Sequence, residues 1–226
     1  MNKGILNKRV AVVSGGGRGI GREIAFTYAR EGCAVILVAR NKEELEKTAQ
    51  EICAKTMVSV DFFAVDVSRA SLVKEMVESI IKRFKKIDIL VNAASINGPI
   101  GLFKDCDVAE WDRTIKINLM GTFNMIKSAL PYMLKKKYGS IVNFAGGGAF
   151  GARPHFSAYS VSKAAVVRLT DALAQELKDT GITVNGISPG QVNTRMFEEM
   201  IAAGKEQVGD QAWKEFQERR KTGGDP

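Results

Sequence analysis

The stretch that decides the fold is Val10-Ala11-Val12-Val13-Ser14-Gly15-Gly16-Gly17-Arg18-Gly19-Ile20-Gly21. It begins with an apolar run typical of a buried strand, Val10–Ser14, and its glycines lead directly into a helix-like segment. Glycine permits a sharp turn, a close approach of the backbone to a pyrophosphate, and tight packing of a helix on a strand. The N–H groups at the start of the helix then face the anion, which the helix dipole also attracts. The stretch therefore predicts a dinucleotide-binding turn.

The alternation of strand and helix continues along the chain. Short runs rich in Val and Ile alternate with longer amphipathic segments, which predicts a parallel sheet with helices on both faces. We expect strands at Val10–Ser14, Val35–Ala39, Val58–Val65, Ile87–Asn92, Ser140–Phe144 and Ile182–Ile187. We expect helices at Ile20–Glu31, Lys42–Ala54, Ser71–Arg83, Trp111–Lys136 and Ala158–Lys178. The predicted fold class is α/β, a three-layer, Rossmann-like, doubly wound parallel sheet in a single domain, residues 1–226.

Composition limits the classes of function. The 226 residues, 45% hydrophobic and 26% charged, are typical of one globular domain. No apolar run reaches the roughly 18 residues of a membrane span, and Met1–Lys8 has no signal-peptide core, so we expect no membrane association and a cytoplasmic location. The three cysteines are far apart, which predicts reduced thiols and no metal site. The net charge of +8 is spread along the chain and favours an anionic cofactor or substrate over nucleic acid.

The end of the second predicted strand indicates which dinucleotide is bound. A dinucleotide fold places the group that recognises the adenosine ribose about twenty residues after the glycine turn. Ala39-Arg40 occupies this place without an acidic residue, and a guanidinium can pair with a 2′-phosphate. Arg18, inside the turn, adds a second positive charge. We therefore expect NADP(H), with NAD(H) as the alternative if Arg40 is simply a solvated strand end.

A second pattern, Tyr159-Ser160-Val161-Ser162-Lys163, lies at the start of a predicted helix. A spacing of four places Tyr159 and Lys163 on one face of that helix. A free tyrosine has a pKa of about 10, and a neighbouring ammonium favours the phenolate and lowers this value. The pair is therefore a candidate for acid–base catalysis, with an ordinary exposed pair as the alternative.

These patterns together resemble the short-chain dehydrogenase/reductase family, whose turn has the spacing Gly-x-x-x-Gly-x-Gly. The resemblance covers Arg9 through Thr194. It implies hydride transfer between a nicotinamide and a small carbonyl or alcohol substrate, with Tyr159 as acid or base, Lys163 lowering its pKa, and Asn118 supporting a water in a proton relay. The cofactor contacts that it implies are Gly15, Gly17, Arg18, Gly19, Ile20, Gly21, Arg40, Asp66, Val67, Asn92, Ala93, Tyr159, Lys163, Pro189, Gly190 and Thr194.

The chain departs from the family pattern at the serine that orients the substrate. This serine normally stands thirteen residues before the tyrosine, where this chain has Gly146, and Phe144–Ala149 contains no hydroxyl. Loss of one such donor costs about 2.7–4 kcal/mol of transition-state stabilisation. Three alternatives stay open: backbone N–H groups near Gly146 replace it, Ser157 or His155 reaches the substrate, or the protein binds NADP(H) without catalysis, as a sensor or an oligomer partner.

The chain also departs from the family pattern after the fourth predicted strand. Asn92-Ala93-Ala94-Ser95 stands where the family has Asn-Asn-Ala-Gly, so the two differ at Ala93 and Ser95.

The last segment, Gln191–Pro226, is helical in composition and predicts a lid over the substrate pocket, with ordinary helix packing as the alternative. Relatives usually continue through another helix and a seventh strand. The resemblance therefore predicts either a truncated sequence or an edge strand covered by another chain. It also implies a homodimer or homotetramer formed through the two long helices. Neither the identity of the substrate nor the direction of the reaction follows from these patterns.

Overall fold

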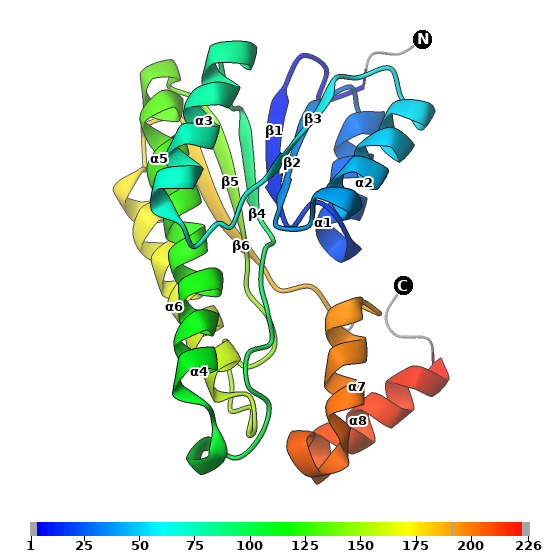
Figure 1. The fold of residues 1–226 in the computed structure, drawn as a ribbon. Helices are drawn as coiled ribbons and strands as arrows, with labels where there is room; N and C mark the ends of the chain where they lie inside the picture. The colour runs from blue at the N-terminus through cyan, green and yellow to red at the C-terminus, as the bar shows by residue number, and fades with distance from the viewer. Residues whose placement is uncertain (1–3, 191, 223–226) are drawn as a thin grey trace.

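The structure is a computed structural model that describes residues 4–190 and 192–222. Six parallel strands form one sheet in the order β3-β2-β1-β4-β5-β6 (Figure 1). The chain runs outward from β1 to one edge and then outward from β4 to the other, so the order reverses between β1 and β4. The predicted doubly wound α/β fold is thus confirmed. The strands are β1 (Val10–Ser14), β2 (Ala34–Ala39), β3 (Val60–Ala64), β4 (Ile89–Asn92), β5 (Gly139–Phe144) and β6 (Ile182–Ile187).

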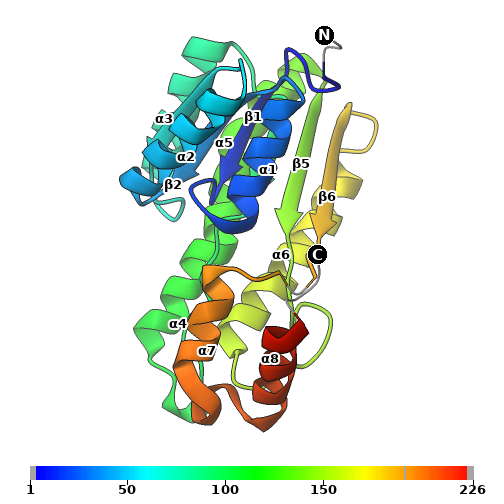
Figure 2. The ribbon, with the colours of Figure 1, turned by 90° about the vertical axis from the view of Figure 1, so that its right-hand side faces the viewer.

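Helices cover both faces of the sheet. The first two helices pack on one face, and α3, α5 and α6 pack on the other (Figures 1 and 2). The helices are α1 (Gly19–Arg30), α2 (Lys42–Lys55), α3 (Ala70–Phe84), α4 (Val108–Ile115), α5 (Gly121–Lys136), α6 (Ser157–Glu176), α7 (Arg195–Val208) and α8 (Asp210–Thr222), with a short 3₁₀ turn at Phe103–Asp105. None of the helices in these described segments combines the length and the apolarity that a membrane crossing requires.

The core follows the two-residue period of the central strand. Val10 and Val12 of β1 point into the core under α3 and α5, whereas Ala11 and Val13 point into the core under α1 and α2. All four side chains are buried. The strand is therefore apolar along its whole length because each of its faces meets a layer of helices.

The predicted helix Trp111–Lys136 is two helices joined by a π-helical turn, Lys116–Met120. A π-turn inserts one extra residue into a helix and is frequent at functional sites. Here the turn contains Asn118, whose side chain is buried and bonds to the backbone of Ile96. The periodic apolar pattern does not reveal this insertion, because the helix axis continues on both sides of it.

Two predicted strands are longer than the observed ones. The third begins at Val60 rather than Val58, and the fourth begins at Ile89 rather than Ile87. In the fourth, Asp88 takes the position before the strand, where its fully buried carboxylate accepts from the N–H of Val10 (2.9 Å).

Three cations surround Asp88 at the amino-terminal edge of the sheet. Its carboxylate lies 2.8 Å from Lys136 Nζ, 3.0 Å from Lys86 Nζ and 3.5 Å from Arg9 Nη1. Burial acts to raise the pKa of Asp88, but these lysines and the Val10 N–H outweigh it, so the net shift of the pKa is downward. The cluster joins the beginnings of β1 and β4 to the end of α5.

The sheet edge at β6 is the least covered part of the sheet. This strand pairs with β5 alone, and alternate residues Thr183, Asn185 and Ile187 are exposed. Figure 2 shows β5 and β6 open on the side where α1 covers β1.

The last two described helices lie beyond the carboxyl ends of the strands, apart from the layers on the sheet (Figure 1). They are held there by a separate apolar cluster that includes Phe156, Tyr159, Phe197, Met200 and Phe216. α7 is interrupted at Gly204, whose φ of 81° breaks the helix. This segment therefore stands opposite the loops that follow the strands.

Candidate active site

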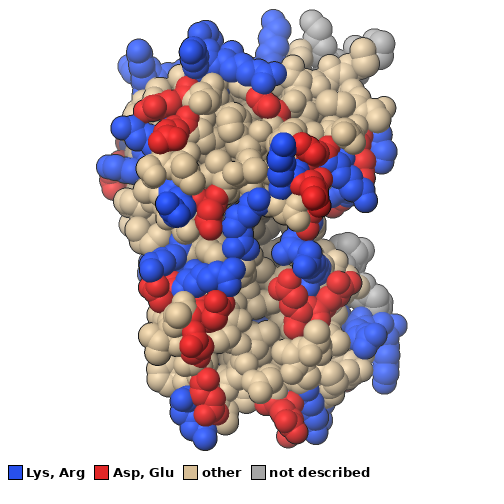
Figure 3. All heavy atoms as spheres, in the orientation of Figure 1, with Lys and Arg blue, Asp and Glu red and all other residues tan. Residues whose placement is uncertain are grey.

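A cavity of about 980 Å³ opens at the carboxyl edge of the sheet, where the strand order reverses. This is the place where open α/β sheets bind ligands. Its wall comes from the glycine turn, the loops after the next five strands, and the last two helices. Figure 3 shows basic and acidic side chains beside the hollow between the sheet and the last two helices. Among the described residues, no group of three or more His, Cys, Asp or Glu side chains could hold a metal ion.

The glycine turn forms a cradle for an anion at one end of the cavity. Gly15 and Gly19 have φ values of 71° and 54°, the left-handed region that favours glycine. A Cβ on Gly15 would lie 2.9 Å from the N of Ala94, and one on Gly21 would lie 2.3 Å from the O of Gly15. No side chain caps the start of α1, and no acidic residue stands in its first turn. The turn therefore fits a diphosphate.

The other predicted cofactor residues largely surround the same cavity. Those that line it are Gly15, Gly17, Arg18, Gly19, Ile20, Gly21, Arg40, Asp66, Val67, Ala93, Tyr159, Lys163, Pro189, Gly190 and Thr194. Asn92 is the exception. It is buried beneath the wall, where its Nδ2 donates to Asn143 Oδ1 (2.8 Å), while its own Oδ1 has no hydrogen-bond partner among the described residues.

The end of the cavity where we expect the adenosine carries more acidic charge than the sequence indicates. Arg40 is exposed on the rim. Glu44, from the first turn of α2, also lines the cavity and lies 3.4 Å from Arg195 Nη1. Arg18 lies 3.9 Å from Glu199. Sequence reasoning missed Glu44 because it considered only the end of β2, whereas Glu44 reaches the site from the following helix.

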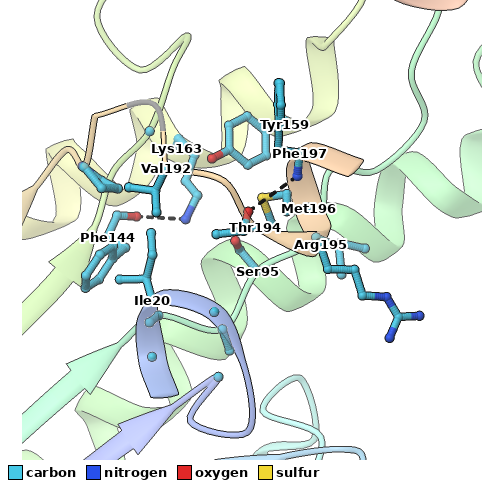
Figure 4. Close-up of a pocket in the computed structure, with 18 of the residues that line it drawn as sticks. Ile20, Ser95, Phe144, Tyr159, Lys163, Val192, Thr194, Arg195, Met196 and Phe197 are labelled. Carbon is cyan, nitrogen blue, oxygen red and sulfur yellow. Dashed lines mark hydrogen bonds between the residues drawn. The ribbon is translucent and has the colours of Figure 1, made fainter. Parts of the chain in front are cut away.

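Tyr159 and Lys163 face the opposite end of the cavity from one face of α6 (Figure 4). Tyr159 is 7% exposed and Lys163 is 3% exposed. The amine of Lys163 lies 5.7 Å from the centre of the Tyr159 ring and donates to the carbonyl O of Phe144 (2.8 Å). Burial lowers the pKa of Lys163 to about 8. The alternative of an ordinary exposed pair is thus wrong.

The pKa of Tyr159 is raised rather than lowered, because burial disfavours the phenolate. The cation that opposes this shift is the guanidinium of Arg153, not the amine of Lys163. The expectation that Lys163 lowers the pKa of Tyr159 is therefore not met in this structure. The reason is that Lys163 is itself desolvated and directed to Phe144.

Asn118 stands behind Tyr159 and Lys163 rather than in the cavity wall. Its Oδ1 accepts from Ile96 N (2.9 Å), and its Nδ2 donates to Ile96 O (3.0 Å) and Ser162 Oγ (3.0 Å). The Ser162 hydroxyl in turn donates to Tyr159 O (2.7 Å). The side chain thus ties the loop after β4 to the helix that carries the tyrosine.

At Gly146, where the family has its serine, there is no room for a side chain. Gly146 lines the cavity, and a Cβ added to it would lie 2.3 Å from the hydroxyl oxygen of Tyr159. The phenol therefore fills the space that a serine side chain would take.

The two other candidate donors do not line the cavity. Ser157 Oγ lies 3.2 Å from Trp111 Nε1, which donates to it. The ring of His155 lies against Gly209, between α7 and α8, where a Cβ on that glycine would come within 2.8 Å of Nε2. Of the three open alternatives, these placements disfavour a direct role for Ser157 or His155.

Several residues of the substrate end were not predicted as site residues. Phe197 and Met200 face the cavity from α7, within the segment that was predicted as a lid but without being singled out as site residues. Arg153 comes from the loop between β5 and α6, and Glu215 and Phe216 come from α8. A loop residue such as Arg153 leaves no periodic signal in the sequence, so its direction becomes visible only in the fold.

Comparison with known proteins decides the family. The model of the short chain dehydrogenases matches residues 9–204. The chain belongs to the short-chain dehydrogenase/reductase family. These are oxidoreductases that bind a nicotinamide cofactor, and the cradle described above fits that group.

Relatives of this dehydrogenase include an uncharacterized oxidoreductase of Staphylococcus epidermidis, 36% identical over 195 residues, which cover 85% of this chain and 82% of the relative. Among solved structures, NAD⁺-bound xylitol dehydrogenase has a TM-score of 0.86 and 32% identity, covering 92% of this chain and 79% of that one. An actinorhodin polyketide ketoreductase variant with NADPH has a TM-score of 0.82 and 35% identity, covering 86% and 75%. Similar folds thus carry either cofactor.

Proposed function

We propose that this dehydrogenase transfers hydride between NADP(H) and a carbonyl or alcohol substrate, with Tyr159 as the acid or base. The observation that carries the proposal is the meeting of two distant patterns in one cavity. The glycine turn and Arg40 line one end, and Tyr159 and Lys163 line the other. Such a convergence of a dinucleotide cradle and buried titratable groups is what an oxidoreductase site requires.

Each residue has a defined part in the proposed reaction. The bound nicotinamide supplies or accepts the hydride. Tyr159 donates its phenol proton to the carbonyl oxygen in reduction and accepts it in oxidation. A phenol with a raised pKa holds this proton at neutral pH, which suits reduction. Lys163 holds the nicotinamide ribose. Asn118 acts as a positioning residue, because its bonds to Ile96 and Ser162 tie the loop after β4 to the helix that carries Tyr159.

The second candidate function is binding of NADP(H) without catalysis, favoured by the glycine at position 146. A test compares NADPH oxidation by the wild type and Tyr159→Phe over a panel of ketones and aldehydes. We expect the variant to lose about 100-fold or more in kcat, within the usual contribution of acid–base catalysis. Its affinity for NADPH, followed by fluorescence, stays unchanged. Tight NADPH binding without any tyrosine-dependent turnover supports the second candidate instead.

The preference for NADP(H) rests on Arg40 and has its own test. Arg40→Gln removes the charge on the cavity rim without touching the catalytic end. We expect its Kd for NADPH to rise by about tenfold or more, the range of a lost hydrogen-bonded ion pair, while its Kd for NADH stays the same. Equal changes for both cofactors contradict the assignment of Arg40 to the 2′-phosphate.

We also propose that residues 191–226 act as the lid over the substrate end. The support is that Met196, Phe197, Met200 and Phe216 line the cavity from α7 and α8. Gln191 and residues 223–226 of this segment lie outside the described part of the chain. The proposed cytoplasmic location and homo-oligomeric state stay predictions.

A further inference from the structure

Arg153 occupies an unusual place for a cation. It belongs to the loop between β5 and α6 and lines the substrate end of the cavity. The carbon of its guanidinium lies 4.2 Å from the centre of the Phe156 ring and 5.9 Å from the centre of the Tyr159 ring. A Cβ added to Gly147 would lie 3.0 Å from its Nη1. The guanidinium therefore stands over the glycine loop, beside the proposed acid.

The guanidinium of Arg153 is partly buried. Burial lowers the pKa of Arg153, although an arginine remains charged under all ordinary conditions. It makes no ion pair with any residue of the described segments. Its one hydrogen bond there goes from Nη2 to the thioether sulfur of Met200 (3.5 Å), which is a weak acceptor. A partly buried cation that forms no ion pair with the described residues is incompletely solvated, so a molecule that supplies a counter-charge would be bound favourably.

The surrounding charges limit what that molecule can be. Glu215 lines the same cavity and is near enough to act electrostatically on Arg153, but forms no ion pair with it. At the cofactor end, Arg195 and Arg18 are already paired with Glu44 and Glu199. The substrate end thus combines one unpaired cation with a nearby carboxylate. This balance suits a single negative charge better than the double charge of a phosphate.

We propose, building on the function proposed above, that Arg153 binds a carboxylate of the substrate, so that the natural substrates are short oxo acids or the matching hydroxy acids. A planar guanidinium binds a carboxylate through two parallel hydrogen bonds, which fixes orientation as well as position. Stacking on Phe156 holds the guanidinium plane. Because Arg153 stands next to Tyr159, the bound carboxylate places the neighbouring carbonyl at the phenol. The second anchor compensates for the serine that Gly146 replaces.

The test uses matched pairs of an acid and its uncharged ester: benzoylformate with methyl benzoylformate, and acetoacetate with methyl acetoacetate. With NADPH, we expect the wild type to have the higher kcat/KM for the acid of a pair. Arg153→Gln should lower that value for the acid by about 10- to 100-fold, the range of a hydrogen bond to a charged group. The kcat/KM of the ester should change by less than about threefold. For the acid, Arg153→Lys should lie between the wild type and Arg153→Gln, since lysine keeps the positive charge but cannot form the two parallel hydrogen bonds.

Glu215→Gln is the matched variant with the opposite sign. Removing this carboxylate should lower the KM of the acids several-fold, because it repels their negative charge. The KM of the esters, which are uncharged, should not change. A wild type that prefers the esters overturns the proposal. So does an Arg153→Gln variant that loses acid and ester turnover equally while its thermal unfolding is unchanged.

Calorimetry separates this proposal from the function on which it rests. Binding of benzoylformate to the complex of the protein with NADP⁺ is measured without turnover, because the oxidised cofactor has no hydride to give. If no panel compound is reduced, but benzoylformate binds the wild type and not Arg153→Gln, the catalytic function fails and the carboxylate site stands. If carbonyls are reduced but benzoylformate binds both proteins equally, the catalytic function stands and the carboxylate site fails.

Discussion

At the scale of single residues, Gly146 and Tyr159 compete for one space. A serine at position 146 would agree with the family pattern, but its Cβ would lie 2.3 Å from a phenol oxygen that is buried among Phe156, Phe197 and Met200. We therefore expect Gly146→Ser to displace the phenol, to lower stability by about 1–3 kcal/mol through overpacking, and to reduce kcat. Thermal unfolding and NADPH oxidation measure the two effects. Gly146→Ala should have the same two effects, because it adds the obstructing Cβ without the hydroxyl. A serine variant faster than the wild type contradicts the prediction.

Lys163 is expected to carry a stability cost that depends on pH. Its pKa falls from 10.5 in water to about 8 in the fold. Between these values the unfolded chain binds the proton more readily, so the cost is fully present below about pH 8 and disappears as the pH rises toward 10.5. Near pH 7 we expect the free energy of unfolding of Lys163→Met to exceed that of the wild type by up to about 3 kcal/mol, measured by urea unfolding. Near pH 10.5 this difference should disappear. A variant that is less stable at both pH values shows that the bond to Phe144 outweighs desolvation.

How much of the site could be predicted is clearest from individual residues. The glycines of the turn and the pair Tyr159–Lys163 were found because a helix and a strand–turn–helix unit impose fixed spacings on the sequence. Arg153 and Glu44 were not, because their approach to the cavity depends on how loops and helices from different parts of the chain are placed. The effect of burial, which raises the pKa of Tyr159 in this structure, was not predicted, since spacing along a helix contains no information about burial.

At the scale of elements, the start of α5 and the loop after β3 form one tight contact. A Cβ on Gly121 would lie 2.5 Å from Cγ2 of Val67, which lines the adenosine end of the cavity. We expect Gly121→Ala to lower stability by about 1–3 kcal/mol through overpacking and to weaken NADPH binding. Unfolding curves and a cofactor titration measure these effects. The double variant Gly121→Ala with Val67→Ala should recover part of the binding, because it removes the obstructing methyl. No recovery contradicts the view that the Val67 methyl is the obstacle.

The elements themselves were largely predictable. β1 and β6 were predicted with the observed bounds, because short apolar strands between glycine-rich or polar segments leave clear edges. The long helix 111–136 was predicted as one element, and its π-turn was not. The extra residue at Lys116–Met120 is stabilised by the bonds of Asn118 to Ile96, a partner more than twenty residues away. Such a tertiary cause leaves no trace in a local pattern.

At the scale of the whole molecule, Asp88 joins the two halves of the doubly wound sheet. We expect Asp88→Asn to lower stability near pH 7 by about 1.5–3 kcal/mol, the range of a hydrogen bond to a charged group, because Lys86 and Lys136 lose their partner but remain partly solvated. The folded pKa of Asp88 is lowered, so its contribution is present at neutral pH and is lost as the pH falls below the ordinary carboxyl value through the folded one. Urea unfolding at several pH values should show the wild type and the variant converging in acid.

The control for Asp88 is Asp171→Asn, which removes the exposed ion pair of Arg168 with Asp171. A surface pair contributes about 0–1 kcal/mol, so this variant should resemble the wild type at every pH. Equal losses of stability in the two variants contradict the view that Asp88 contributes more to stability because it is buried.

The unequal cover of the sheet should produce a gradient of amide hydrogen exchange in deuterated buffer. Strands enclosed by helices exchange only when the molecule opens widely, whereas a strand beside water opens by local fraying. Protection should be greatest in β1, between two paired neighbours, and should decline through β5 to β6, where Ile187 is 44% exposed. Mass spectrometry of peptic fragments would measure this order. The outer strand is thus the part of the sheet that samples open forms most often.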